Sequence, residues 1–243
     1  MKIFIINPDY GMTDGQLAQR CQLLAQYVGP DVELHMECLT QNKIALDSAL
    51  DAALAAPEII TLAARAQREG YDAVVIYCFS DPAVDACREL LHIPVVGGGQ
   101  AACLLAPLVG RQAGLLLADV LRAPEKRLFV EQCGVAPGRI AAIGGVDGRG
   151  LDVWRERERT LALLADAGRK LLDESRAQIL ILGCLSFLGL ARPLGERLGV
   201  PVIDAAVAAV SLAESLARQG LHTSRRAYPE PPARLRSWSG GSL

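Results

Sequence analysis

Two cysteines occupy the same place in two copies of one sequence pattern. Cys78 comes directly after an apolar run at residues 73–77, and Cys184 closely follows a second run at 178–182. Each cysteine opens a Cys-x-Ser tripeptide. In both copies a helical stretch then leads to a short strand with the sequence Ile/Val-Pro-Val, which begins at Ile93 and Val200. Two copies of one α/β unit predict two similar lobes related by a pseudo-two-fold axis.

The position of the two thiols predicts proton transfer. Ligands of open parallel sheets bind outside the carboxyl ends of the strands, and both cysteines lie at such ends. A pseudo-two-fold axis would bring them face to face across a cleft. One thiolate could then remove a proton from a carbon while the opposite thiol returns one to the other face. A reference pKa of about 8.5 suits a thiol for both roles. The pattern therefore predicts inversion of a stereocentre next to a carbonyl.

Residues close to Cys78 predict further help for this chemistry. Asp81 and Pro82 have the residue types of a helix N-cap and a first helical position. A helix that begins there would aim free N–H groups at a bound carboxylate or at the oxygen of an enolate. Hydroxyl groups of Ser80 and Ser186 could add hydrogen bonds at the same level.

The remaining cysteines are predicted to be buried packing residues. The total of seven is odd, and the spacing follows no metal-binding pattern. Disulfides are rare in cytoplasmic proteins. We therefore expect ordinary core or helix positions for five cysteines: Cys21, Cys38, Cys87, Cys103 and Cys133.

The elements that must position the two thiols alternate along the chain. Short apolar runs predict eight strands, at residues 2–6, 32–36, 73–77, 93–96, 113–117, 140–143, 178–182 and 201–203. Amphipathic or alanine-rich stretches predict helices between and after them, at 16–27, 57–68, 100–108, 152–172 and 205–216, with Pro57 at a first helical position. Strands that are apolar on both faces are typical of parallel sheets covered by helices, so we expect an α/β fold.

This order of elements predicts the domain organisation. Residues 1–98 together with about 205–222 form the first predicted α/β lobe, with a Rossmann-like parallel sheet. Residues 99–204 form the second lobe, and the active site is expected in the cleft between them. Residues 223–243 are rich in proline, glycine and serine, which predicts an extended or disordered tail.

Composition excludes several classes of partner. The formal net charge is only -2 and the arginines are scattered, so we expect no nucleic-acid partner. No apolar stretch is long enough to span a membrane, and the apolar start is interrupted at Asn7. We therefore expect a cytoplasmic protein that acts on a small molecule.

Cofactor sites are not predicted. A pyridoxal phosphate enzyme needs a Schiff-base lysine, and the four lysines (Lys2, Lys43, Lys126 and Lys170) open a strand or lie in or beside predicted helices. The glycine runs at 97–99 and 144–145 lack the spacing of a dinucleotide or phosphate loop. We expect neither a cofactor nor a metal.

Several motifs, in order along most of the chain, resemble the aspartate/glutamate racemase superfamily, and in particular its hydantoin and allantoin racemase branch. The opening Asn7-Pro8-Asp9 with Met12-Thr13 resembles the Asn-Pro-Asn motif of that branch and the Met-Thr that follows it. The segment 78–82 resembles its Cys-Phe-x-Asp-Pro motif. The segments 93–97, 182–184 and 199–204 resemble its next strand and its second cysteine motif.

The resemblance implies a cofactor-independent racemase with two lobes. It implies Cys78 and Cys184 as the acid/base pair, with Cys78 serving the D form and Cys184 the L form. It also implies a homo-oligomer, and substrate contacts from the side chain or backbone of Asn7, Phe79, Ser80, Leu185 and Ser186. Asn7 could alternatively cap its own loop, and Thr13 or Asp14 is expected as a helix N-cap.

Departures from the family pattern leave the substrate open. Asp9 replaces the usual second asparagine of the opening motif, and Ala118 follows the strand at 113–117 where the family commonly has threonine. Gln100 stands where glutamate is common, and Ser80 stands where glycine is common. The motifs of true glutamate racemases are absent. We expect a 5-substituted hydantoin or a related cyclic ureide such as allantoin. The alternatives are an amino-acid racemase with a substrate other than glutamate, a lyase or cis–trans isomerase acting on a dicarboxylate, and a non-catalytic small-molecule sensor.

Overall fold

The computed structural model of the chain describes all residues except 134–135, 137, 149–150, 233–236, 239–240 and 243. The chain divides into two compact units. Unit 1 comprises Met1–Gly97 and Ala209–Leu243, and unit 2 comprises Gly98–Ala208.

Unit 1 is built on a four-stranded parallel sheet. Its strands are β1 (Lys2–Tyr10), β2 (Glu33–Leu39), β3 (Ala73–Ile76) and β4 (Val95–Gly97), in the order β2-β1-β3-β4. The sheet is buried on both faces, because consecutive residues such as Ile5 and Ile6, which point to opposite faces, are both fully inaccessible. This explains why its strands are continuous apolar runs.

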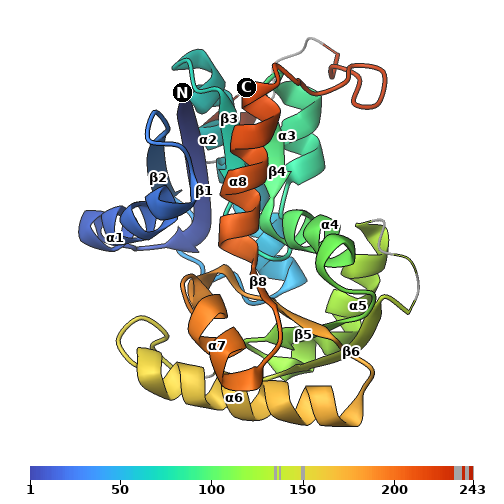
Figure 1. Cartoon of the computed structure of the whole chain (residues 1–243). Helices are drawn as coiled ribbons and strands as arrows, with labels where there is room; N and C mark the ends of the chain where they lie inside the picture. Colours follow the sequence, from blue (N-terminus) through green and yellow to red (C-terminus); the bar gives the residue numbers. More distant parts are fainter. Residues whose placement is uncertain (134–135, 137, 149–150, 233–236, 239–240, 243) are drawn as a thin grey trace. The chain divides into compact units, whose positions relative to one another are not determined.

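Helices cover both faces of this sheet. Unit 1 contains α1 (Asp14–Leu24), the 3₁₀ turn η1 (Ala25–Tyr27), α2 (Ala49–Arg68), α3 (Val84–Leu90) and the larger part of α8 (Ala205–Arg218). In Figure 1, α8 lies in front of the sheet and α2 behind it.

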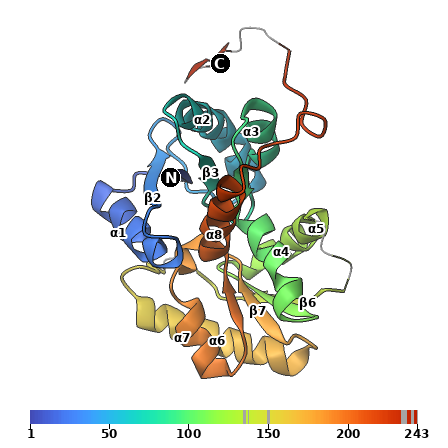
Figure 2. The same cartoon turned by 45° about the horizontal axis from the view of Figure 1, so that its top comes forward.

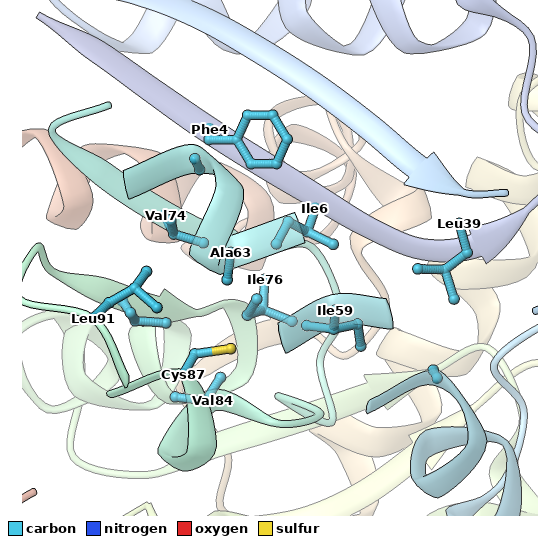
Figure 3. Packing of buried hydrophobic residues seen from close by; sticks show 13 residues of the cluster. Phe4, Ile6, Leu39, Ile59, Ala63, Val74, Ile76, Val84, Cys87 and Leu91 are labelled. Carbon is cyan, nitrogen blue, oxygen red and sulfur yellow. The ribbon is translucent and has the colours of Figure 1, made fainter. Parts of the chain in front are cut away.

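One face of the sheet packs on α2 and α3. Phe4 and Ile76 from the strands meet Ile59 and Ala63 from α2 and Cys87 from α3 in one core cluster (Figure 3). Burying each large apolar side chain contributes about 1.5–3 kcal/mol. This cluster holds the strand from which Cys78 emerges.

Unit 2 repeats the strand order of unit 1. Its parallel sheet contains β5 (Ala113–Leu117), β6 (Ile140–Gly145), β7 (Ile179–Leu182) and β8 (Val202–Asp204), in the order β6-β5-β7-β8. Around it lie α4 (Gly98–Val109), η2 (Val120–Arg122), α5 (Ala123–Gln132), α6 (Arg157–Glu174), η3 (Leu185–Phe187) and α7 (Ala191–Leu198). Both views show α6 and α7 side by side (Figure 2). Leu116, Leu180 and Leu182 of the sheet share a core cluster with Leu164 of α6 and Leu194 of α7.

The two sheets agree in register as well as in strand order. The amide of Tyr77 donates to Ile6 O at 2.8 Å, and the amide of Gly183 donates to Leu116 O at 2.7 Å. Likewise, Val74 N donates to Pro94 O and Leu180 N to Pro201 O, both at 2.9 Å. Cys78 and Cys184 therefore each lie two residues beyond the end of the equivalent strand, β3 or β7. The predicted α/β fold with two similar lobes is confirmed.

The predicted helix starts at Pro57 and near residue 152 are wrong. Pro57 lies inside α2, which begins at Ala49 after the N-cap Ser48. The alanine-rich segment before Pro57 has high helix propensity, and the Ser48 side chain accepts from Asp51 N at 3.1 Å, so the helix starts earlier than proline suggests. α6 begins at Arg157 rather than near 152. Residues 152–156 instead form turns in which the carboxylate of Asp152 accepts from the amides of Trp154 and Arg155.

The described start of the C-terminal segment lies against α3. Thr223 is buried, and its amide donates to His92 O at 3.0 Å. The guanidinium of Arg225 donates to the Arg88 and Glu89 carbonyls at the end of α3. The prediction of an extended or disordered tail over 223–243 includes residues outside the described part of the chain. Within the described residues, no helix is both long and apolar enough to cross a membrane.

Candidate functional site

The Cys78 segment begins where β3 stops pairing. After Ile76 the strand leaves the sheet, and Cys78 N donates to Ile76 O at 2.9 Å. The thiol is half-buried. The Ser80 amide donates to Cys78 Sγ at 3.4 Å, and an N–H donor at sulfur favours the thiolate over the thiol. Phe79 between them is 3% exposed, which anchors the turn.

The predicted helix start at Asp81 and Pro82 is wrong. Asp81 has φ 49° and Ala83 has φ 59°, so neither continues a right-handed helix. Helix α3 begins only at Val84, has seven residues, and receives no side-chain cap at Ala83. It is too short and too late to supply the anion-binding N-terminus that the sequence suggested.

The carboxylate of Asp81 lies at the end of β4 instead. A Cβ placed on Gly97 would collide with Asp81 Cγ and both of its carboxylate oxygens. The absence of a side chain at Gly97 therefore creates the space that Asp81 fills. Asp81 and Ala83 are the only non-glycine residues with positive φ in the described part of the chain. Such conformations cost about 1–3 kcal/mol each and often occur at functional sites.

Asn7 lies on β1, one residue beyond the last pair of β1 with β3. Its side chain is buried at 3% exposure. Its Nδ2 lies 2.8 Å from Met12 Sδ, and its Oδ1 accepts from Asp9 N at 3.2 Å. These bonds hold the loop that leads to α1. Thr13 caps that helix in a reciprocal capping box with Gln16, which confirms the predicted N-cap.

Asp9 ties the same loop to the segment after β2. Its Oδ1 accepts from Leu46 N at 2.9 Å, and Tyr10 N donates to Ile44 O at 3.0 Å. Burial raises the pKa of the Asp9 carboxyl, and the Leu46 amide opposes that shift. The carboxyl group thus serves as a half-buried link between the end of β1 and the segment after β2.

The Cys184 segment begins in the same way in unit 2. Gly183 has no room for a side chain, because an added Cβ would lie 2.7 Å from Leu117 Cδ2 and 3.0 Å from the Leu116 oxygen. The half-buried Cys184 is the N-cap of η3, and its carbonyl accepts from Phe187 N at 3.1 Å. Leu185 is 2% exposed and Phe187 is fully buried.

The predicted site residues therefore fall into two groups. Asn7, Cys78, Phe79 and Ser80 lie at the carboxyl edge of the unit 1 sheet, and Cys184, Leu185 and Ser186 lie at the carboxyl edge of the unit 2 sheet.

Sequence reasoning gave no role to two charged residues of unit 2. Asp204 ends β8 and caps α8, where its Oδ1 accepts from Ala206 N at 3.0 Å and Val207 N at 3.3 Å. Its Oδ2 accepts from Gly189 N at 2.8 Å, and Arg157 donates to Leu188 O at 2.9 Å. An aspartate between a strand and an alanine-rich stretch signals a helix cap. No local pattern signals the part played by Arg157.

The other cysteines differ from Cys78 and Cys184 in their surroundings. Cys38, Cys87 and Cys103 are buried, as predicted, whereas Cys21 and Cys133 are half-buried, contrary to that prediction. Burial raises the pKa of Cys87 to about 12 and that of Cys21 to about 11, so these two thiols stay protonated at neutral pH. Within the described residues, no three histidine, cysteine or carboxylate side chains gather as a metal site would require.

A family model and a curated relative each match most of the chain. Residues 3–213 match the sequence model of the family described as Asp/Glu/Hydantoin racemase. A hydantoin racemase of Paenarthrobacter aurescens is 34% identical over 238 residues, which cover 95% of this chain and 98% of that protein.

Solved structures share the fold. An allantoin racemase from Klebsiella pneumoniae superposes with a TM-score of 0.90 at 26% identity, covering 98% of this chain and 97% of that one. An arylmalonate decarboxylase superposes with a TM-score of 0.65 at 19% identity, covering 90% and 94%. The latter likeness concerns the fold alone.

Proposed function

Because the chain belongs to the Asp/Glu/hydantoin racemase family, we propose that it racemises a 5-substituted hydantoin or a related cyclic ureide such as allantoin, with Cys78 and Cys184 as acid and base. One observation carries the proposal. Two half-buried thiols follow equivalent strands by two residues, in two units of identical strand order and register.

The proposed reaction is a transfer of protons. One cysteine thiolate takes the proton from the ring carbon that bears the substituent, and the C–H electron pair moves into the enolate of the neighbouring carbonyl. The thiol of the other cysteine then protonates the opposite face of that carbon. No electron is gained or lost, and the roles of the cysteines are exchanged for the other enantiomer. The hydrogen bond from Ser80 N to Cys78 Sγ would stabilise the thiolate.

The residues around the thiols favour an uncharged substrate. The strand-end segments 77–82, 117–120 and 183–187 contain no lysine or arginine that could pair with a carboxylate, and their only charged residues are Asp81 and Asp119. A free amino acid carries both a carboxylate and an ammonium group, which a site usually recognises with opposite charges or several directed hydrogen bonds. A cyclic ureide instead offers neutral carbonyl and N–H groups that backbone amides and Asn7 could bind.

The relatives support the same class of substrate. The names of the matched proteins refer to hydantoin and allantoin racemases, and both of those substrates contain a five-membered ureide ring. We propose that Phe79, Ser80, Leu185 and Ser186 contribute backbone amides to the substrate and that Asn7 contributes its side chain or orders the adjoining loop.

A panel of single enantiomers tests the proposal. Hydantoins with different 5-substituents, allantoin and free amino acids are incubated with the protein in D₂O, and loss of optical rotation and entry of deuterium are followed. Both signals are expected for cyclic ureides and neither for amino acids. Racemisation of amino acids but not of ureides would contradict the substrate proposal, and binding without deuterium entry would contradict the proposed reaction.

Single variants test the mechanism. Cys78→Ala and Cys184→Ala are each expected to lower racemisation about 10²- to 10⁴-fold, the usual contribution of a general acid or base. Each variant should still exchange deuterium into the one enantiomer that faces its remaining thiol, and the two variants should differ in which enantiomer that is. Cys133→Ala, which removes another half-buried thiol, is the control. Wild-type racemisation by either active-site variant would exclude the two-thiol mechanism.

A further inference from the structure

The Cys184 segment ends in a tight turn of defined type. Leu190 N donates to Phe187 O at 2.9 Å, so residues 187–190 form a β-turn. Leu188 has φ -42° and ψ 127°, and Gly189 has φ 79°. These are the angles of a type II turn, whose third position favours glycine. Reversing the central peptide between Leu188 and Gly189 would convert it to the more common type I turn.

Two charged side chains hold that central peptide from its two ends. The carbonyl of Leu188 accepts from Arg157 Nη2 at 2.9 Å. The amide of Gly189, which belongs to the same peptide unit, donates to Asp204 Oδ2 at 2.8 Å. If the peptide flipped, the carbonyl would turn toward the carboxylate and the N–H toward the guanidinium. The two charges therefore favour the type II form over the type I form.

Capping of α8 requires only the Asp204 carboxylate, so the desolvation of Arg157 and of Asp204 Oδ2 is an additional cost in free energy. Asp204 is half-buried, and burial raises the pKa of its carboxyl, although three backbone amides and the nearby Arg157 lower it. The guanidinium of Arg157 stacks 5.2 Å from the Trp154 ring, and its Nη1 is buried without a hydrogen bond to any described residue. Charges that are partly withdrawn from water in this way contribute little net stability and can instead fix one conformation.

The turn is mechanically connected to Cys184. The carbonyl of Cys184 accepts from Phe187 N, and that of Leu185 accepts from Leu188 N, both at 3.1 Å. Phe187 is fully buried in the unit 2 core. A change at the Leu188–Gly189 peptide therefore has to be absorbed by the short segment between Cys184 and Phe187.

From this geometry we propose that Arg157 and Asp204 are positioning residues, which clamp the Leu188–Gly189 peptide and thereby fix the Cys184 thiol for proton transfer. The proposal rests on the proposed function, because it assigns a purpose to the placement of one of the two thiols. Neither residue needs to contact the substrate.

Asp204→Asn is the sharpest test. Asparagine caps helices as well as aspartate does, so its Oδ1 can still accept from the α8 amides. Its NH₂ group, which takes the place of Oδ2, cannot accept from Gly189 N. Racemisation is expected to fall on the order of 10²-fold, as displacements of about 1 Å do at catalytic groups. Deuterium exchange should survive for one enantiomer, the same one that survives in Cys184→Ala.

Arg157→Met acts on the other end of the peptide and covers the case in which Asp204→Asn fails to fold. It should reproduce the one-sided exchange, and Arg157→Lys should restore part of the racemisation because a lysine can still donate to Leu188 O. Asp152→Asn is the matched control, since its carboxylate accepts from the Trp154 and Arg155 amides in the same unit. Wild-type racemisation in both clamp variants, or equal loss of exchange for both enantiomers, would overturn the proposal.

A second readout does not depend on turnover. The rates at which iodoacetamide alkylates Cys184 and Cys78 are measured in each folded protein by mass spectrometry. The clamp variants should change the Cys184 rate at least about threefold while the Cys78 rate stays constant, and an unchanged ratio would overturn the proposal. If the wild-type protein racemises no ureide, the proposed function fails while this ratio still tests the clamp.

Discussion

The Cys78 and Cys184 segments start from the same frame and are stabilised in opposite ways. Strand order, register and the first amide hydrogen bond agree. In unit 1 the carboxylate comes from the loop, as Asp81, and fills the space left by Gly97 at the strand end. In unit 2 the carboxylate comes from the strand end, as Asp204, and reaches Gly189 in the loop. The positions of carboxylate and glycine are thus exchanged between loop and strand.

This exchange changes where backbone strain is located. The Cys78 loop contains two non-glycine residues with positive φ, whereas the Cys184 loop uses Gly189 for that conformation. Glycine adopts positive φ without a steric penalty. The edge of a sheet can therefore hold a thiol in two ways. The Cys78 loop has a strained backbone whose carboxylate packs on a glycine, and the Cys184 loop has an unstrained turn whose central peptide is bonded to two charged side chains.

Among variants that test this difference, Gly97→Ala should have the largest effect on stability and racemisation. The added methyl group occupies the place of the Asp81 carboxylate, so the carboxylate must leave and the Cys78 loop must move. Overpacking of this kind costs about 1–3 kcal/mol, and racemisation should fall at least about tenfold. Urea unfolding and the optical assay measure the two effects. A fully active, fully stable variant would show that the packing of Asp81 against Gly97 is unimportant.

Gly189→Ala tests the relaxed turn. The φ of 79° penalises alanine by about 1–2 kcal/mol, and the new Cβ would lie 3.2 Å from Arg157 Nη2. Gly199→Ala is the matched control, because Gly199 has φ 69° and open space around it. Both variants should lose similar stability in thermal unfolding, but only Gly189→Ala should lose racemisation. Equal activity losses would contradict a specific role for the turn.

Asp9→Asn concerns the half-buried carboxyl group near the end of β1. Burial raises the pKa of Asp9, so the folded state binds its proton more tightly than the unfolded state does. Stability from this group is present at low pH and is lost as the pH rises through the folded pKa. Asparagine stays neutral, so Asp9→Asn should gain stability over wild type at pH 7, and the gain should shrink toward pH 3.

The unit 2 counterpart supplies the control for that measurement. Asp119 occupies the equivalent position after β5, where its Oδ1 accepts from Leu121 N at 2.9 Å. Asp119→Asn is expected to change the urea midpoint less at both pH values. A loss of stability in Asp9→Asn at pH 7 would mean that the Leu46 hydrogen bond outweighs the burial of charge.

Ala83→Gly should have the smallest effect. Glycine at φ 59° relieves strain, but it also raises the entropy of the unfolded chain by roughly 0.4–1 kcal/mol. These contributions oppose each other, so the free energy of unfolding should change by less than about 1 kcal/mol. Ala217→Gly within α8 relieves no backbone strain, because a helical residue has negative φ, and should therefore cost about 1 kcal/mol. A larger loss at Ala83 than at Ala217 would argue against strain in the Cys78 loop.

Much of the fold was predictable from local pattern. The apolar runs predicted eight parallel strands, because a strand buried on both faces has no polar alternation; the bounds of β5 agree with the prediction and the others differ by a few residues. The repeat of Cys-x-Ser located both thiols at strand ends. Helix starts were less predictable, since Pro57 and Asp81 have residue types that suit a helix start but lie in other surroundings.

The sequence by itself determined the α/β units, the two thiols at matched strand ends and the family, because each depends on residues close together in the chain. Only the tertiary structure decided how each thiol segment is held. The packing of Asp81 against Gly97 and the clamp of Arg157 and Asp204 on one peptide join residues 15 to 31 positions apart in the chain. Such contacts follow from how helices and strands pack in space, and no spacing along the chain encodes them.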